Sequence, residues 1–198
     1  MFVLGLTGSI GMGKTTAANM FKLLGVPVYD ADSTVHYLLS KNTAVLKQVS
    51  DRFPKSFDGL SIDRQILGAI VFNDPQARKD LETIIHPHVR EMSRKFLWNQ
   101  SRINARLVVL DIPLLYETGS DSRANAVVVV TAPKFLQLRR VLLRPGMNIK
   151  KLEGILESQM SDYDKRRRAD FIVETGIGKA YTYRALSRLV NLLRIQNS

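Results

Sequence analysis

One short stretch near the start of the chain limits its fold more than any other feature. Residues 8–15 read GSIGMGKT, which fits the pattern G-x-x-x-x-G-K-[ST]. The apolar run from Phe2 to Leu6 predicts a buried strand before it, and a helix is expected from Lys14 to Leu24 after it. In this order the turn aims backbone N–H groups at an anion, and the helix adds the positive end of its dipole. We therefore predict an α/β fold built around a nucleotide-binding loop.

The individual residues of this loop suit the chemistry of a bound nucleotide. Gly8, Gly11 and Gly13 allow the backbone to turn so that its N–H groups face phosphate oxygens. The Lys14 ammonium is expected to reach the β- and γ-phosphates of ATP, and the Thr15 hydroxyl to coordinate Mg²⁺. The residues that we expect to bind ATP at this loop are Gly8, Gly11, Met12, Gly13, Lys14, Thr15 and Thr16.

Apolar runs and helical patterns alternate along much of the chain. Strand-like runs occur at Val28–Asp30, Leu107–Ile112, Ala126–Thr131 and Phe171–Glu174, and helical patterns at about 134–143, 149–160 and 179–195. Strands that alternate with helices form parallel sheets covered on both faces. We therefore predict a parallel α/β core.

The stretch from Asp32 to about Asn99 is mostly helical and separates the second predicted strand from the third. Within it we expect a long helix at about Gln76–Trp98, with a bend at Pro87 because proline removes one helical hydrogen bond. We interpret this stretch as an inserted cap. The expected division is a core of residues 1–34 and 104–198, a cap of about 35–103 and, within the core, a lid of about 139–168.

The chain carries a large positive charge. Its 29 Lys and Arg against 18 Asp and Glu give a net charge of +11 and a pI near 10.1. A positive field suits nucleic-acid binding, but it suits equally an enzyme that holds two polyphosphate ligands. The basic residues are scattered, with one short run at Arg166–Arg168, and no recognisable nucleic-acid motif accompanies them. We therefore favour the enzyme.

The chain has no cysteine, which excludes disulfides and thiolate metal sites and suits a reducing compartment. No apolar run approaches the ~20 residues that a membrane helix needs, and the apolar start is too short for a signal peptide. We expect a cytoplasmic protein without membrane or nucleic-acid partners, either a monomer or a weak homo-oligomer. Three histidines without cysteine argue against zinc at His86-Pro87-His88, and we expect His36 to be packed or partly buried.

Three aspartates are predicted at the carboxyl ends of strands, where parallel α/β sheets bind their ligands. Asp30 and Asp32 follow the second predicted strand, and a carboxylate there can hold an acceptor hydroxyl in line or accept its proton. Each could instead only cap the following helix. Asp111 ends the LVVLD run, which is the pattern of a second P-loop element with a carboxylate near Mg²⁺. The alternative for Asp111 is a turn residue that only ends the strand.

Basic residues after the fourth predicted strand are candidates for a lid. Arg140 and Arg144 are four residues apart, so a helix would place both on one face, and guanidinium groups suit phosphate oxygens. A solvated basic face is the alternative for both arginines. We expect Lys165–Arg168 to be surface charge.

The chain lacks the N-K-x-D motif that a regulatory GTPase is expected to carry, and it is short for a motor or helicase core. Its size suits a kinase for a small acceptor. Two alternatives stay open at this point. One is a kinase of the same fold for another small molecule, such as a nucleoside or a sugar, and the other is a nucleic-acid-binding ATPase.

Together the motifs resemble those of the dephospho-CoA kinase family. The segments that carry the resemblance are LTGSIGMGKTT (6–16), VYDAD (28–32), IHP (85–87), DIPLLYE (111–117), QLRR (137–140), Gln159, Lys165 and Ala169-Asp170. The resemblance spans residues 3 to about 176. One departure follows the last predicted strand, in a region that contacts adenine in the family. There the family often has Asn and a small residue before Gly, whereas this chain reads Glu174-Thr175-Gly176.

The resemblance implies a five-stranded parallel P-loop kinase core with a helical, acceptor-binding cap and a lid. It implies that ATP phosphorylates the ribose 3′-hydroxyl of dephospho-coenzyme A, the last step of coenzyme A synthesis. By motif match, Asp32 would be the catalytic carboxylate, and Lys14 and Arg140 would stabilise the phosphoryl group. The other residues implied are Arg144 for ATP, Thr7, Asp30, His86, Asp111 and Leu115 for dephospho-CoA, and Thr15 and Asp111 for Mg²⁺.

Overall fold

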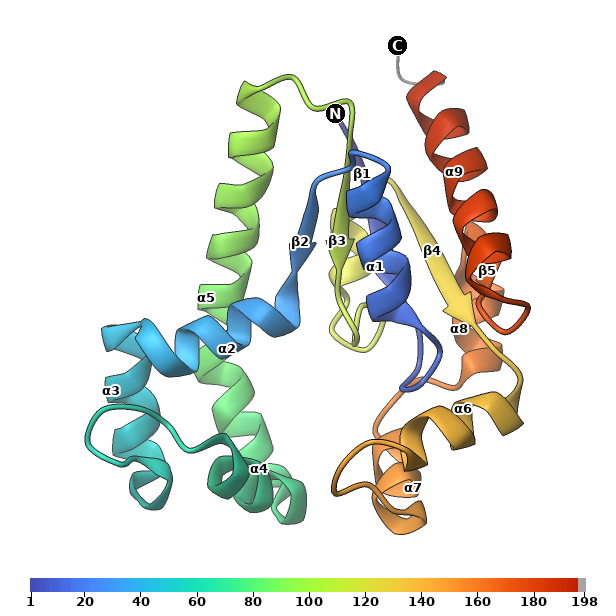
Figure 1. Cartoon of the computed structure of the whole chain (residues 1–198). Helices are drawn as coiled ribbons and strands as arrows, with labels where there is room; N and C mark the ends of the chain where they lie inside the picture. Colours follow the sequence, from blue (N-terminus) through green and yellow to red (C-terminus); the bar gives the residue numbers. More distant parts are fainter. Residues whose placement is uncertain (196–198) are drawn as a thin grey trace. The chain divides into compact units, whose positions relative to one another are not determined.

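The computed structural model describes residues 1–195 and contains a five-stranded parallel sheet with the order β2-β3-β1-β4-β5 (Figure 1). The strands are β1 (Phe2–Thr7), β2 (Val28–Asp30), β3 (Leu107–Asp111), β4 (Ala126–Thr131) and β5 (Phe171–Glu174). The parallel α/β core predicted from the alternation of strands and helices is confirmed. The chain divides into two compact units, one of Met1–Asp30 with Asn99–Ser198 and one of Ala31–Trp98.

The first unit is organised around β1, which pairs with β3 on one side and β4 on the other. Strands β3 and β4 are buried along their whole length, as expected for central strands covered on both faces. Helices α1 (Lys14–Leu23) and α9 (Lys179–Ile195) pack against this sheet (Figure 1). The apolar cluster that joins them to the strands includes Leu4, Phe21, Val128, Leu186 and Val190.

Three further helices of the first unit lie between β4 and β5 in the chain. They are α6 (Lys134–Leu142), α7 (Ile149–Glu157) and α8 (Asp162–Arg168). The sequence pattern predicted one helix over 149–160, which was wrong at its end, because α7 stops at Glu157 and a separate helix follows. The hydroxyl of Ser161 accepts from the backbone N–H of Asp164 and so caps α8. A short 3₁₀ helix, η2 (Ser120–Arg123), precedes β4.

The second unit is helical and has its own apolar core. Its elements are α2 (Ala31–Lys41), α3 (Thr43–Arg52), the 3₁₀ helix η1 (Pro54–Ser56), α4 (Arg64–Asn73) and most of α5 (Pro75–Arg102), which continues beyond the end of the unit at Trp98. Asn42 caps α3 and Asp63 caps α4, each through a side-chain oxygen that accepts from the first turn. Helix α5 continues through Pro87. Within the described residues, no helix combines the length and the apolarity needed to cross a membrane.

Helix α1 ends in a Schellman motif. The N–H of Gly25 donates to the carbonyl of Lys22, and the N–H of Val26 donates to that of Phe21. The motif needs a left-handed residue after the helix, and Gly25 has a φ of 68°. This turn delivers the chain from α1 into β2, whose end carries Asp30.

Substitution by alanine should change the free energy of unfolding in opposite directions at Gly25 and at Gly68. Gly25→Ala places a side chain in the left-handed region, so the free energy of unfolding should fall by about 1–2 kcal/mol. Gly68 lies inside α4, and a Cβ there would meet no atom within 4 Å. Gly68→Ala should therefore raise helix stability by up to about 1 kcal/mol. Urea unfolding of both variants measures this, and stabilisation by Gly25→Ala would contradict the assigned turn.

Candidate active site

The loop between β1 and α1 has the backbone geometry of a phosphate cradle. Gly11 and Gly13 have φ values of 79° and 89°, which favour glycine. Gly8 is required for a different reason. A Cβ at that position would lie 2.6 Å from the carbonyl oxygen of Val130 on β4, too close for any side chain.

The carbonyl groups of this loop are held by named donors. Gln137 Nε2 donates to the carbonyl of Ile10 at 2.8 Å, and Arg140 Nη1 donates to that of Gly11 at 3.3 Å. The Thr175 hydroxyl donates to the carbonyl of Met12 at 2.7 Å. Because the C=O and N–H of one peptide point in opposite directions, holding each carbonyl fixes the direction of the N–H that follows it. Side chains from α6 and from the segment after β5 thus orient the loop.

Both peptide groups that meet at Ile10 are held. Its N–H donates to Gln159 Oε1 at 3.1 Å, while its carbonyl accepts from Gln137. Gln137 is only 6% exposed although it is polar, so its amide is committed to this contact. Gln159 comes from the junction between α7 and α8. Neither glutamine received a role from the sequence beyond its place in a motif.

An ion pair joins the loop to the neighbouring strand. Lys14 Nζ lies 2.7 Å from Asp111 Oδ1, and the side chains are 14% and 3% exposed. Asp30 at the end of β2 stands beside Asp111 in the sheet register. The carboxyl ends of β1, β2 and β3 therefore gather the lysine and two carboxylates at one edge, as predicted for an α/β ligand site.

A cavity of about 320 Å³ opens beside the loop. It is lined by Gly11, Gly13, Thr15, Thr16, Arg140, Arg144, Thr175, Lys179 and Thr182. The expectation that Arg140 and Arg144 share a helix face was wrong, because α6 ends at Leu142 and Arg144 lies in the turn beyond it. Both arginines nevertheless line this cavity.

Hydrogen bonds within the protein hold the Arg140 side chain in place. Besides its bond to Gly11, it donates from Nη1 to the Thr175 hydroxyl at 3.0 Å and from Nη2 to the Thr175 carbonyl at 2.8 Å. Its guanidinium is thus fixed on the side of the loop where the cavity lies. The sequence placed this charge in a mobile lid, whereas the structure shows it as part of the loop's support.

The segment Asp111–Glu117 after β3 is held at several points. The Thr7 hydroxyl donates to the carbonyl of Pro113 at 2.9 Å. Leu115, expected to contact substrate, is fully buried, and it fills the space that a Cβ on Gly5 would need. Its side chain therefore supports the segment from inside. Burial raises the pKa of Tyr116 to about 12, so this phenol stays protonated at neutral pH.

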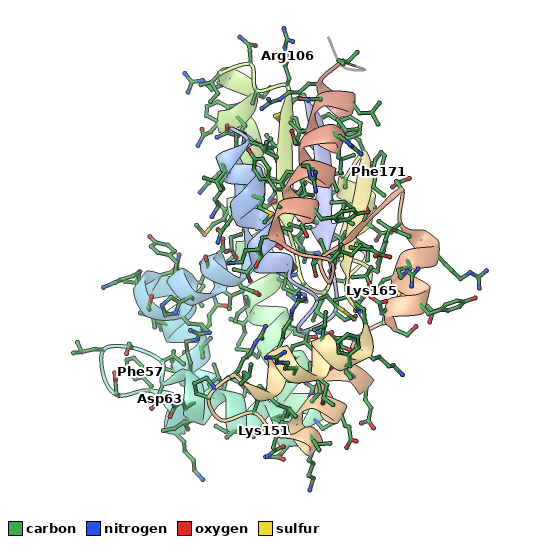
Figure 2. The ribbon with its side chains drawn as sticks, turned by 45° about the vertical axis from the view of Figure 1, so that its right-hand side comes forward. Phe57, Asp63, Arg106, Lys151, Lys165 and Phe171 are labelled. Carbon is green, nitrogen blue, oxygen red and sulfur yellow. The ribbon has the colours of Figure 1, made fainter. Side chains whose placement is uncertain are left out.

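Lys165 corrects the expectation of a basic surface run. Its side chain is 0% exposed and pairs with Glu117 Oε1 at 2.9 Å, while Arg166–Arg168 are exposed as predicted. The short helix α8 turns this one position toward the sheet (Figure 2). A single lysine in a run of four basic residues gives no sequence signal that it is buried.

The second unit carries the remaining predicted residues. Helix α2 begins at Ala31, so Asp32 is an exposed residue of its first turn rather than the residue before the helix. His86 is half-buried in α5, next to Pro87. His36 is exposed, contrary to expectation, and its Nδ1 accepts from Arg64 at 3.1 Å. Among the described residues, no group of three or more His, Cys, Asp or Glu could by itself hold a metal ion.

The donors present fit Mg²⁺ bound together with a nucleotide. Mg²⁺ takes oxygen ligands, keeps several waters and usually uses only one or two protein groups beside substrate phosphates. Thr15, which carries a hydroxyl, lines the cavity, and Asp111 with its carboxylate stands at the end of β3. These are hard oxygen donors next to the loop, and no larger acidic cluster is needed.

A glycine-rich loop whose peptides are held in place, a lysine at the strand ends and a cavity of about 320 Å³ beside them define the class of the protein as a P-loop nucleotide-binding protein. The comparison with protein families narrows this class. The model of the dephospho-CoA kinase family (CoaE) matches residues 2–178. The chain therefore belongs to the dephospho-CoA kinase family, and it is an enzyme with dephospho-CoA kinase activity.

Individual relatives agree with this assignment. The dephospho-CoA kinase of Paramagnetospirillum magneticum is 53% identical over 166 residues, which cover 84% of this chain and 78% of that one. That of Mesorhizobium japonicum is 48% identical over 196 residues, 99% and 98% of the two chains. Among solved structures, TT1252 from Thermus thermophilus matches with a TM-score of 0.84 and 33% identity over 96% of each chain. The dephospho-CoA kinase from Campylobacter jejuni matches with a TM-score of 0.64 and 27% identity over 96% of each.

Thr175→Val should weaken ATP binding. The substitution keeps the shape of the side chain but removes the donor to the Met12 carbonyl and an acceptor of Arg140. Losing such a bond costs about 1–2 kcal/mol, so the KM for ATP should rise roughly 5- to 30-fold. Steady-state kinetics measures this, with Thr43→Val on the exposed start of α3 as the matched control. An unchanged KM would show that the hydroxyl does not hold the loop in its binding shape.

Proposed function

We propose that the protein transfers the γ-phosphate of ATP to the ribose 3′-hydroxyl of dephospho-CoA, with Mg²⁺ as the metal. The observation that carries this proposal is the loop itself, with its oriented N–H groups and with Lys14 beside Asp111. The family match supports dephospho-CoA as the acceptor. The net charge of +11 suits an enzyme that must bring two polyphosphate ligands together.

The cavity beside the loop is the proposed place of the adenosine part of ATP. Its volume lies at the lower end of the range for small-molecule sites, about 300–1,000 Å³. The backbone N–H groups of the loop would bind the phosphates, and Lys14 would neutralise charge on the β- and γ-phosphates. The guanidinium of Arg140, held beside Gly11, adds positive charge at the loop. The role at the γ-phosphate that the resemblance implied for Arg140 stays a prediction.

Mg²⁺ would be held by the Thr15 hydroxyl and by Asp111, directly or through water, where it would neutralise charge on the phosphates. Asp32 is the proposed catalytic carboxylate. It is exposed, follows Asp30 by two residues and can hold the acceptor hydroxyl in line or accept its proton. Thr7, Asp30 and His86 stay predicted contacts of the acceptor.

Asp32→Asn should abolish most turnover while ATP still binds. The amide keeps the size of the side chain but cannot accept the proton, and general-base or positioning groups contribute about 10²- to 10⁴-fold to kcat. Single-turnover kinetics and titration with a fluorescent ATP analogue measure the two properties separately. Asp51→Asn on the exposed surface of α3 is the control. Near-normal kcat in Asp32→Asn would remove Asp32 from the mechanism.

The acceptor is tested by ADP release in a coupled assay with ATP and Mg²⁺. Dephospho-CoA should stimulate release, and adenosine, AMP and shikimate should not. Mass spectrometry and nuclease digestion of the product should place the new phosphate on the ribose 3′-oxygen. Greater stimulation by one of the other acceptors would overturn the proposed substrate but not the nucleotide site. Omission of Mg²⁺ should remove the activity.

A further inference from the structure

A fully buried lysine, Lys165, lies in α8 and does not line the nucleotide cavity. Lys165 Nζ pairs with Glu117 Oε1 at 2.9 Å and donates to the carbonyl of Pro113 at 3.3 Å. Both partners belong to the segment Asp111–Glu117. The lysine is 0% exposed and Glu117 is 17% exposed, so solvent screens this pair little.

The segment Asp111–Glu117 is thereby held along its length. Asp111 at its start pairs with Lys14. The carbonyl of Pro113 accepts from both the Thr7 hydroxyl and Lys165. Glu117 at its end accepts from Lys165 and also from the backbone N–H of Met160 at 2.8 Å. The segment is thus joined to the phosphate-binding loop at one end and to the α7–α8 junction at the other.

The same junction also reaches the phosphate-binding loop directly. Gln159, which precedes Met160, accepts from the N–H of Ile10 at 3.1 Å. Gln159, Met160 and Lys165 are close in sequence, and between them they contact both segments at the edge of the sheet. The α7–α8 junction, together with Lys165, therefore sets the spacing between the phosphate-binding loop and the segment Asp111–Glu117.

Stability alone does not explain a buried pair of this kind. Well-packed apolar residues of similar size often stabilise a protein as much or more, because two charges must lose their hydration. The pair instead contributes geometric specificity, because the Lys165 ammonium can bind the Glu117 carboxylate and the Pro113 carbonyl together from only one position. Such a group restricts the segment to one arrangement.

We propose that Lys165 is a positioning residue for the acceptor side of the reaction. It acts through Glu117 and Pro113 and holds the segment Asp111–Glu117 at the distance from Lys14 that phosphoryl transfer requires. The inference rests on the proposed function, in which this segment borders the acceptor. The carbonyl bonds that shape the phosphate-binding loop come from Gln137, Arg140 and Thr175, so they do not depend on Lys165.

The test uses the double variant Lys165→Met/Glu117→Gln in the full chain. Methionine keeps the length of the apolar stem, and glutamine keeps an oxygen that can accept from Met160, so no unpaired charge stays buried. The single variant Lys165→Met leaves the Glu117 carboxylate without its cation and should unfold more easily. Arg167→Met, at an exposed position of the same helix, is the matched control.

For the double variant we expect separate effects on the two substrates. Displacing reacting groups by about 1 Å can cost on the order of 10²-fold, so kcat/KM for dephospho-CoA should fall by about 10- to 100-fold. Most of this fall should be in kcat with dephospho-CoA as acceptor, because the double variant misplaces the segment without removing a proposed contact to the acceptor. The Kd of a fluorescent ATP analogue should stay within about two-fold. Arg167→Met should match the parent in both properties.

Two results would overturn the proposal. If kcat/KM for dephospho-CoA in the folded double variant equals that of the parent, Lys165 only fills space. If acceptor kinetics and ATP affinity fall together with the melting temperature, the pair has a general structural role. Failure of the proposed function is distinguishable from both results, because the parent enzyme itself would then not phosphorylate dephospho-CoA.

Discussion

The site depends on the direction of a few peptide groups. A glycine-rich loop can bend in many ways, and only some of them aim successive N–H groups at a phosphate. In this protein the carbonyls of Ile10, Gly11 and Met12 are each bound by a side chain, so the N–H groups that follow them have fixed directions. That of Met12 donates to the carbonyl of Ser9 within the loop, whereas among the described residues no protein acceptor is seen for those of Gly11 and Gly13. Preorganised dipoles of this kind need no rearrangement when charge develops in the transition state, which is why they are effective in catalysis.

A second set of contacts fixes the segment after β3, which borders the proposed acceptor site. The ion pair between Lys14 and Asp111 links the ATP loop to the segment after β3, and Lys165 holds the far end of that segment. In phosphoryl transfer the protein contributes little covalent chemistry and acts mainly by positioning the reacting groups and by stabilising their charge. A chain of contacts that fixes both segments against one sheet edge meets that demand. The charged groups of the site therefore act as much through geometry as through charge.

Much of this arrangement could be predicted from the sequence. The P-loop pattern has a known local geometry, and the runs LVVLD and AVVVVT are typical of buried parallel strands, so the parallel core and the place of Asp111 at the end of a strand followed. The supporting residues could not be predicted in the same way. Gln137 and Thr175 reach the loop from more than 120 residues away, and Lys165 looks like its exposed neighbours. Only a weak signal existed for Gln137, which shares the buried face of α6 with Val141 four residues on.

The distances in sequence between the loop and its supports have a consequence for how the protein is made. The partners of Ile10, Gly11 and Met12 lie 127 to 163 residues further along the chain. During synthesis the loop leaves the ribosome early, but the residues that give it its shape emerge only with the last third of the chain. Contacts so distant in sequence also form late in a folding reaction, because closing the intervening chain is slow. The capacity to bind ATP thus arises when the fold is complete, and a nucleotide that binds only this state favours the finished protein over partly folded chains.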